Sequence, residues 1–206
     1  MEASVEAPRR LEGDKAQRII AAMRASVAKR GAAGSTFDHV AREAGVSRGL
    51  LHYYFGSKER LLVEVVRADC QVRIERIERQ LEGATTVDDV IAALVTGLED
   101  FIDEDPDQTS GAAAVCELVT ASRDSEDIRA ELAQLYRRWR EHLGAALRQK
   151  EQEGVVQLKA EPEVVASVLF SLADGFGLQV IADPDWDRTP SFALGVETAR
   201  HLLGAS

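Results

Sequence analysis

Apolar residues recur along this chain at helical spacing, and strand-like alternation is not sustained anywhere. Intervals of three and four residues place such positions on one face of a helix. The pattern therefore predicts an all-α protein. We expect helices over residues 14–30, 37–44, 48–54, 57–82, 85–104, 110–121, 125–152, 161–181 and 191–203.

Residues 35–60 hold the clearest local pattern. The apolar positions of the first short helix share one face, and they are Phe37, Val40, Ala41 and Ala44. Ser35 or Thr36 can cap that helix, because a hydroxyl oxygen accepts an unpaired backbone N–H. Gly45 can adopt the left-handed backbone that ends it, and Ser47 can cap a second short helix. This arrangement predicts a helix-turn-helix whose second helix is suited to the DNA major groove.

The register of the second helix separates inner from outer residues. Val46, Leu51 and Phe55 can point inward, which leaves the outer positions Arg48, Gly49, Leu50, His52 and Tyr53. Arginine can pair with guanine and leucine can touch a thymine methyl, whereas Ser47 and Tyr53 suit phosphate oxygens. Ser57 can cap the next helix, so Lys58 lies in its first turn, a favourable place for a phosphate. The alternative is a helical hairpin with a purely structural role.

The string V-S-R-G-L-L-H-Y-Y-F-G-S-K-E-R-L-L, residues 46–62, resembles the TetR family of bacterial transcriptional regulators. The similar region covers about residues 15–66. The resemblance implies an all-helical dimer with a three-helix DNA-binding part, a connecting fourth helix and a variable helical ligand-binding part.

The resemblance also implies roles for individual residues. Thr36 matches a phosphate-contacting position, and Tyr53 and Lys58 match contacts to the DNA backbone. Arg48, Gly49 and Leu50 match the base-reading stretch. The chain departs from the family at two positions, because many members have Tyr in place of His52 and His in place of Tyr54. The expected DNA-binding set is Thr36, Ser47, Arg48, Gly49, Leu50, His52, Tyr53 and Lys58.

The charge of the chain is unevenly distributed. Residues 9–60 contain 11 Lys and Arg against 5 Asp and Glu, whereas residues 61–206 contain 14 against 28. The formal net charge of −10 therefore conceals a positive segment that coincides with the helix-turn-helix. Local positive charge drives phosphate binding, so the acidic total does not exclude a DNA-binding function.

These observations divide the chain into a disordered tail at 1–12, a helix-turn-helix domain at 13–60 and a helical effector-binding and dimerisation domain at 61–206. We expect a cytoplasmic protein with reduced thiols, because no secretory signal is visible and the two cysteines match no metal spacing. No segment reaches the roughly 20 apolar residues of a membrane span. Acidic residues near 100–107 lack the calcium-loop pattern, so we expect no metal and no cofactor.

The helix expected at 161–181 is apolar on most faces. It is either the central helix of a monomer or a helix with one face against a partner. The family resemblance implies a homodimer built from the last two helices of each chain. Small residues that would let helices approach closely are Ala166, Ala173, Gly175 and Gly177.

The family resemblance implies a ligand cavity in the second domain. Such sites are concave and mostly apolar. The candidate residues of the cavity are Phe101, Cys116, Tyr136, Trp139 and Phe170. The alternative for each is an ordinary place in a packed core. Arg123, Arg140 and His142 could meet an anionic ligand or form surface ion pairs.

The sequence thus predicts a transcriptional repressor that binds a palindromic double-stranded DNA operator as a dimer and is released by a small molecule. An activator or an effector-independent DNA-binding protein remains an alternative. A helical enzyme or adaptor is the rival from another class. An enzyme needs a converging nucleophile, base or metal set, and the sequence offers none.

Overall fold

The computed structural model describes residues 13–102 and 111–205. The tail expected at 1–12 and the end expected at residue 104 for the fifth helix lie outside these ranges. Within them the chain is all-α, as the sequence predicts, and contains no strand. The helices are α1 (Asp14–Gly34), α2 (Phe37–Ala44), α3 (Arg48–Phe55), α4 (Lys58–Glu82), α5 (Val87–Ile102), α6 (Gly111–Ala121), α7 (Glu126–Gln152), α8 (Pro162–Ala182) and α9 (Thr189–Leu202).

Most helix ends follow from local sequence. Gly31, the expected end of the first helix, has φ 67° and ψ 169° and interrupts α1 three residues before its end. Gly45 has φ 65° and ψ 39°, the left-handed conformation that ends α2. Pro162 begins α8, where its missing N–H costs little.

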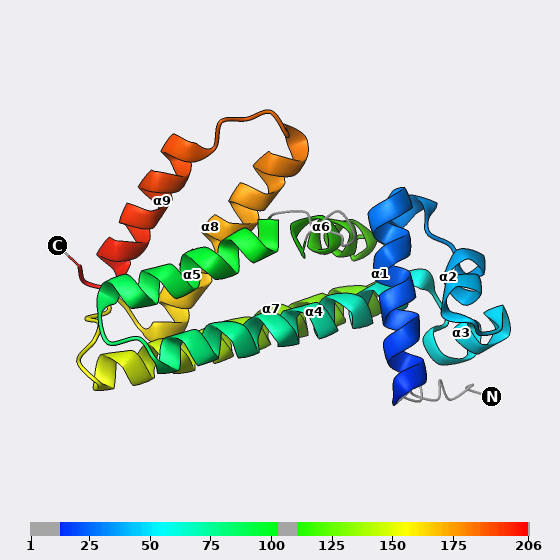
Figure 1. Ribbon diagram of the computed structural model, residues 1–206, viewed down its shortest axis with the longest axis horizontal. Helices are drawn as coiled ribbons and strands as arrows, with labels where there is room; N and C mark the ends of the chain where they lie inside the picture. The colour runs from blue at the N-terminus through cyan, green and yellow to red at the C-terminus, as the bar shows by residue number, and fades with distance from the viewer. Residues whose placement is uncertain (1–12, 103–110, 206) are drawn as a thin grey trace.

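Helices α1–α3 form a head at one end of the molecule (Figure 1). The predicted stripe of α2 is buried: Phe37, Val40, Ala41 and Ala44. Leu51 of α3 is fully buried beside it, and Val46 and Phe55 pack partly against the same core. The apolar cluster continues from the head through α4 into α6 and α7. The head therefore shares a hydrophobic core with the near part of the remaining helices, called the body below, and a second apolar cluster joins α4, α5, α7, α8 and α9 at the far end.

Helices α4 and α7 run side by side in the same direction, from the head to the far end (Figure 1). Polar contacts follow this parallel pairing. Arg60 pairs with Asp127, Arg67 Nη2 lies 2.6 Å from Glu131, and Glu78 lies 3.0 Å from His142 Nδ1.

The far ends of α4 and α7 are joined by Lys150, which is 3% exposed. Its ammonium lies 2.6 Å from Glu153 and donates at 3.1 Å to the carbonyl of Ala84, just beyond α4. The pairing fixes α4 along much of its length.

Helix α8 packs against α5, α6 and α7 in the body. Among the described helices it alone has the length and composition of a membrane span, with a mean hydropathy of 1.8. The expectation that no segment reaches this apolar length is therefore wrong for α8. The core helix of a soluble protein passes the same test, but only 22% of this segment is buried, because one face of α8 is exposed in the single chain.

Candidate DNA-reading surface and ligand cavity

Serine and threonine side chains cap the starts of α2, α3 and α4. Thr36 Oγ1 accepts the N–H of His39 at 3.3 Å, and Ser47 Oγ accepts the N–H of Leu50 at 3.2 Å. Ser57 caps α4 in the same way, through the N–H of Arg60. These hydroxyls satisfy backbone donors that would otherwise be unpaired at the helix starts. The caps place the first residues of α3 at the exposed edge of the head.

Arg48, the first residue of α3, is held between two side chains. Its Nη1 lies 3.1 Å from Asp38 of α2, and its Nε donates to His52 Nε2 at 3.2 Å. The Arg48 and Asp38 side chains are each 59% exposed. A surface pair of this kind contributes little stability, so a guanine or a phosphate can replace it at small cost.

The other predicted DNA-binding residues lie on the same part of the head. Gly49 is exposed, with no atom near the place of a Cβ. Tyr53 is 62% exposed and its ring meets Tyr54 edge-on at 5.0 Å. The exposed ring of His52 packs edge-on against Phe37 at 4.8 Å. Lys58 opens α4 and is half-buried.

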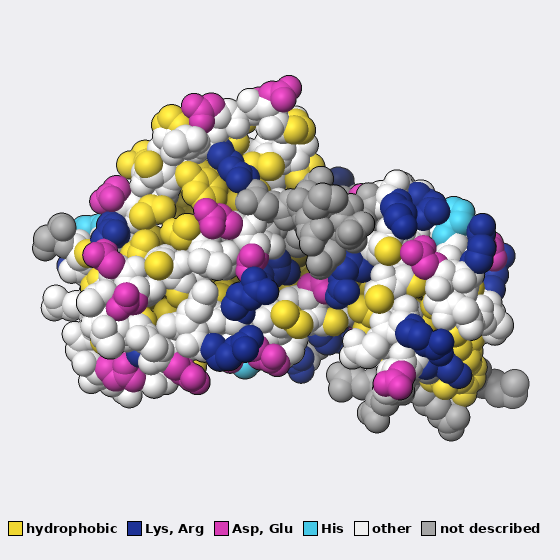
Figure 2. Space-filling model, in the orientation of Figure 1, with side chains coloured by type: hydrophobic (Ala, Val, Ile, Leu, Met, Phe, Trp, Pro, Cys, Tyr) yellow, Lys and Arg dark blue, Asp and Glu magenta, His cyan; other side chains and the backbone are white. Residues whose placement is uncertain are grey.

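Leu50 differs from its expected outward position. It is half-buried and packs against the head core. In a helix of only eight residues, a large side chain next to Leu51 can reach the edge of the core. Part of the Leu50 side chain remains accessible. Figure 2 shows Lys and Arg side chains gathered on the head, consistent with the positive segment of the sequence.

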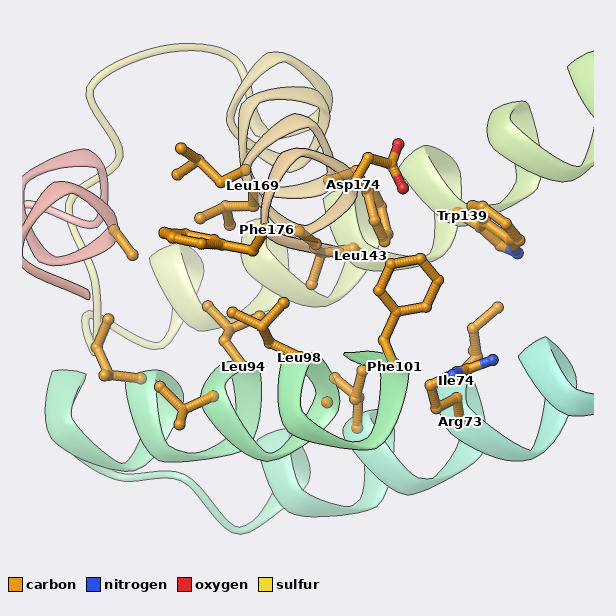
Figure 3. A pocket seen from close by; sticks show the side chains of 18 of the residues that line it. Arg73, Ile74, Leu94, Leu98, Phe101, Trp139, Leu143, Leu169, Asp174 and Phe176 are labelled. Carbon is orange, nitrogen blue, oxygen red and sulfur yellow. The ribbon is translucent and has the colours of Figure 1, made fainter. Parts of the chain in front are cut away.

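The body contains an apolar cavity of about 150 Å³ with walls from α4, α5, α7, α8 and α9. Three of the predicted ligand residues line it: Phe101, Trp139 and Phe170. Tyr136 adjoins the wall through its ring, 4.8 Å from that of Trp139. Cys116 lies on α6, half-buried, outside the lining. Figure 3 shows Phe101, Trp139 and Arg73 near one end, and Leu94, Leu169 and Phe176 toward the other.

Three charged residues of this wall, Arg73, Glu78 and Asp174, were missed by the sequence reasoning. Asp174 lies on α8 and accepts a 2.6 Å hydrogen bond from the hydroxyl of Tyr136. Burial raises the pKa of the Asp174 carboxyl, and the bond from Tyr136 only partly offsets that rise. The pKa of the Tyr136 hydroxyl is also raised, by burial and then by Asp174. Between residues 164 and 182 Asp174 is the one charged residue, and this was the available signal.

Arg73 of α4 is the second missed residue. Its Nη1 donates to the carbonyl of Asp100 at 3.2 Å, and its guanidinium carbon lies 5.4 Å from the centre of the Phe101 ring. Neighbouring Cys70 is a free thiol whose pKa burial raises to about 11. Cys70 is therefore protonated at neutral pH and acts as a small apolar wall residue.

Helix α8 presents a second apolar stripe to solvent. Residues spaced alternately by four and three line this outer face: Val164, Val168, Ser171, Gly175 and Leu178. Leu194, on α9, is 69% exposed. Three of the small residues expected at a dimer face instead point inward: Ala166 is buried, Ala173 lines the cavity and Gly177 approaches Ala112.

Metal-binding groups are not assembled in the part of the chain that the structure describes, where no three His, Cys, Asp or Glu side chains come together. The acidic residues at 103–107 lie outside that part. Of the residues considered for an anionic ligand, His142 lines the cavity and is paired with Glu78.

Comparison with known families assigns both parts of the chain. Residues 19–65 match the family described as bacterial regulatory proteins, tetR family. Residues 90–205 match the C-terminal region of BetI-type transcriptional repressors. The transcriptional regulator BetI of Rhizobium meliloti is 30% identical over 122 residues, 59% of each chain. BetI of Agrobacterium fabrum is 46% identical over 50 residues, 24% of each chain. This chain thus covers less than two thirds of these relatives.

Solved structures share the fold over nearly the whole chain. A Rhodococcus sp. protein described as a TetR-family regulator aligns with a TM-score of 0.75 and 21% identity, over 92% of this chain and 98% of its own. A transcriptional regulator from Saccharomonospora viridis, solved in complex with choline, aligns with a TM-score of 0.71 and 20% identity, over 92% of this chain and 97% of its own. At these identities the likeness concerns the fold alone.

Proposed function

The chain belongs to the TetR family of bacterial transcriptional regulators, and from this premise we propose that it is a repressor that binds a palindromic operator as a homodimer and releases it when a small molecule enters the body cavity. Family members are regulators and not enzymes. The observation that carries the proposal is one continuous helix, α4, which begins beside the DNA-reading residues and forms a wall of the cavity.

The head supports operator reading. Helix α3 exposes Arg48, Gly49 and Tyr53, and Lys58 follows at the start of α4. Arg48 can read a guanine, while Tyr53 and Lys58 can hold phosphates on either side of the groove. Because these positions also match the family's contacts, we assign the DNA-binding surface to them. This function requires DNA, so we place the protein in the cytoplasm.

The outer stripe of α8 supports a homodimer. The four-three spacing of its residues is typical of helices that pack with others in a bundle. Leu178 is 53% exposed and Val164 is 52% exposed in the single chain, and Leu194 of α9 is 69% exposed. A second copy would bury this surface and would set two heads on successive major grooves, about 34 Å apart.

The proposed release mechanism is a shift between two spacings of the heads. Arg24 of α1 pairs with Asp69 of α4, and one turn later α4 borders the cavity at Arg73. A ligand that favours one position of α4 would therefore favour one position of the head. The ligand acts through its difference in affinity for the DNA-bound and free arrangements.

Genome-wide mapping of bound sites in the source organism tests this function. We expect discrete sites that share an inverted repeat and lie in promoters, with loss of those sites in cells that carry Arg48→Ala. The absence of enriched sites, or identical maps for the two proteins, would refute operator reading through α3. Expression of the adjoining genes should rise when the regulator is deleted, and a fall would refute repression.

A further inference from the structure

One end of the cavity contains a carboxylate without a cation. Asp174 lines the wall, is half-buried and takes part in no ion pair among the described residues. Its carboxylate accepts a hydrogen bond from the neutral hydroxyl of Tyr136, at 2.6 Å. Moving a carboxylate out of water without a compensating charge is unfavourable. The site therefore has unsatisfied affinity for a positive charge.

Aromatic rings surround the same end of the cavity. The Trp139 ring lies 4.8 Å from that of Tyr136 and 6.0 Å from that of Phe170. Phe101 of α5 lies at this end near Trp139 (Figure 3), and the guanidinium of Arg73 lies over its ring. The faces of such rings attract cations, most strongly those of tryptophan, and the effect grows when the cation leaves water. Carboxylate and rings thus favour the same kind of ligand.

The two basic side chains of the wall, Arg73 and His142, have partners other than Asp174. Arg73 donates to the carbonyl of Asp100 at 3.2 Å and lies over the ring of Phe101. His142 lies 3.0 Å from Glu78. Neither is paired with Asp174, and Arg73 comes from the opposite wall, on α4.

The rest of the cavity is long and apolar. Its lining follows α4 from Cys70 to Leu81 and α5 from Ile91 to Phe101. At 1.5 Å per residue, each of these walls is about 15 Å long. Away from Asp174 the lining is mainly aliphatic and includes Leu94, Leu143, Leu169 and Val196. A small cation would fill one end and leave this apolar channel empty.

We propose that the effector is an elongated amphiphilic cation, whose ammonium group lies between Asp174 and Trp139 and whose alkyl chain extends along α4 and α5. This inference rests on the proposed function, since it names the ligand of the same cavity. Primary and quaternary ammonium heads share the required charge. Choline has the head without the chain, and a fatty acid has the chain with the opposite charge.

Calorimetric titration of the full-length protein with four probes tests this assignment, each below its micelle-forming concentration. The probes are decyltrimethylammonium, decylammonium, decanoate and choline. We expect both decyl cations to bind, and decanoate and choline to bind roughly tenfold more weakly or worse. A preference between the two cations identifies the head group. Decanoate binding as tightly as the cations would overturn the proposal and would favour Arg73 as the anchor.

Two variants with the same change in net charge separate a specific site from general attraction to an acidic protein. Asp174→Asn keeps an oxygen for the hydrogen bond from Tyr136 and should weaken binding of the decyl cations about tenfold. Asp124→Asn, exposed in the turn after α6, should leave binding unchanged. Equal affinity of Asp174→Asn and wild type would overturn the proposal. If Asp174→Asn does not fold, the four-probe series on the wild type decides.

The same probes distinguish failure of this inference from failure of the proposed function. Operator binding is measured separately, by anisotropy on a mapped site. Selective cation binding that leaves operator affinity unchanged supports the ligand class and refutes effector release. Operator binding without selective cation binding keeps the DNA-binding function and refutes the ligand class.

Discussion

The hydroxyl of Tyr136 donates a 2.6 Å hydrogen bond to the carboxylate of Asp174 and joins α7 to α8 beside the cavity. The two groups come from a strongly charged helix, α7, and a mainly apolar one, α8. The contact supplies Asp174 with one hydrogen bond but no positive charge. Its consequences for stability and for ligand binding can be measured separately.

Asp174→Asn is expected to raise the free energy of unfolding at neutral pH. Burial raises the folded-state pKa of Asp174 above its ordinary 3.8, so the ionised carboxylate opposes folding. That cost is absent below pH 3.8, grows as the pH rises through the folded-state pKa, and is complete above it. The stability difference between variant and wild type should therefore increase with pH. Urea unfolding across this range measures it, and a difference independent of pH would contradict the assignment.

Arg48→Ala should weaken operator binding by about 1–3 kcal/mol and binding to random DNA by much less, because a guanine contact is specific. Competition between the two DNAs, measured by anisotropy at fixed salt, gives the ratio. Equal losses on both DNAs would make Arg48 a contact to the sugar-phosphate backbone.

Asp38→Asn should tighten DNA binding. Asp38 holds Arg48 Nη1 at 3.1 Å in the free protein, so the substitution removes both a competitor for the guanidinium and a negative charge near phosphates. Glu43→Gln serves as the control, because Glu43 is an exposed acidic residue of the same helix and pairs with Lys29 instead of Arg48. A gain no larger than that of the control would show that the Arg48–Asp38 pair does not compete with DNA.

Gly45 and Arg48 show which features of the head could be predicted from the sequence and which could not. The buried stripe of α2, the turn at Gly45 and the caps at Thr36 and Ser47 depend on neighbours within a few residues, and the structure has them as predicted. The pair between Arg48 and Asp38 joins two helices and depends on their crossing, which a single sequence does not contain. The outward position predicted for Leu50 was wrong for the same reason, because packing between helices determines the direction of this side chain.

The cavity follows from sequence much less completely. Phe101, Trp139 and Phe170 were expected to line it and do, but most of its wall is aliphatic and comes from five helices. The place of Asp174 in the cavity wall could not be predicted, because it depends on the contact with Tyr136 of α7. The outer stripe of α8 is present in the sequence as the spacing of Val164, Val168 and Leu178. It was not predicted, because the helix is apolar on most faces and the stripe does not stand out.

Lys58→Ala should weaken binding to all DNA sequences. Loss of one phosphate contact should reduce the slope of log K against log salt concentration by about 0.9. Lys159→Ala, an exposed change in the body, should leave the slope unchanged. Full affinity together with an unchanged slope would remove Lys58 from the DNA contacts.

Leu194→Glu should shift the protein from dimer to monomer without unfolding it. Leu194 is 69% exposed on α9, so the charge is tolerated in the single chain but is costly in an apolar interface. Val72→Glu, on α4 and 58% exposed, provides a matched control that should remain dimeric. Sedimentation velocity and circular dichroism give the two readouts. A dimeric Leu194→Glu variant would place the interface elsewhere.

Operator recognition by α3 in a dimer is tested most directly by a titration of the strongest mapped genomic site with the purified protein, in competition with random DNA. We predict binding of two chains per inverted repeat, with affinity at least about a thousandfold above that for random DNA at physiological salt. Binding by single chains, or equal affinity for the two DNAs, would contradict the account.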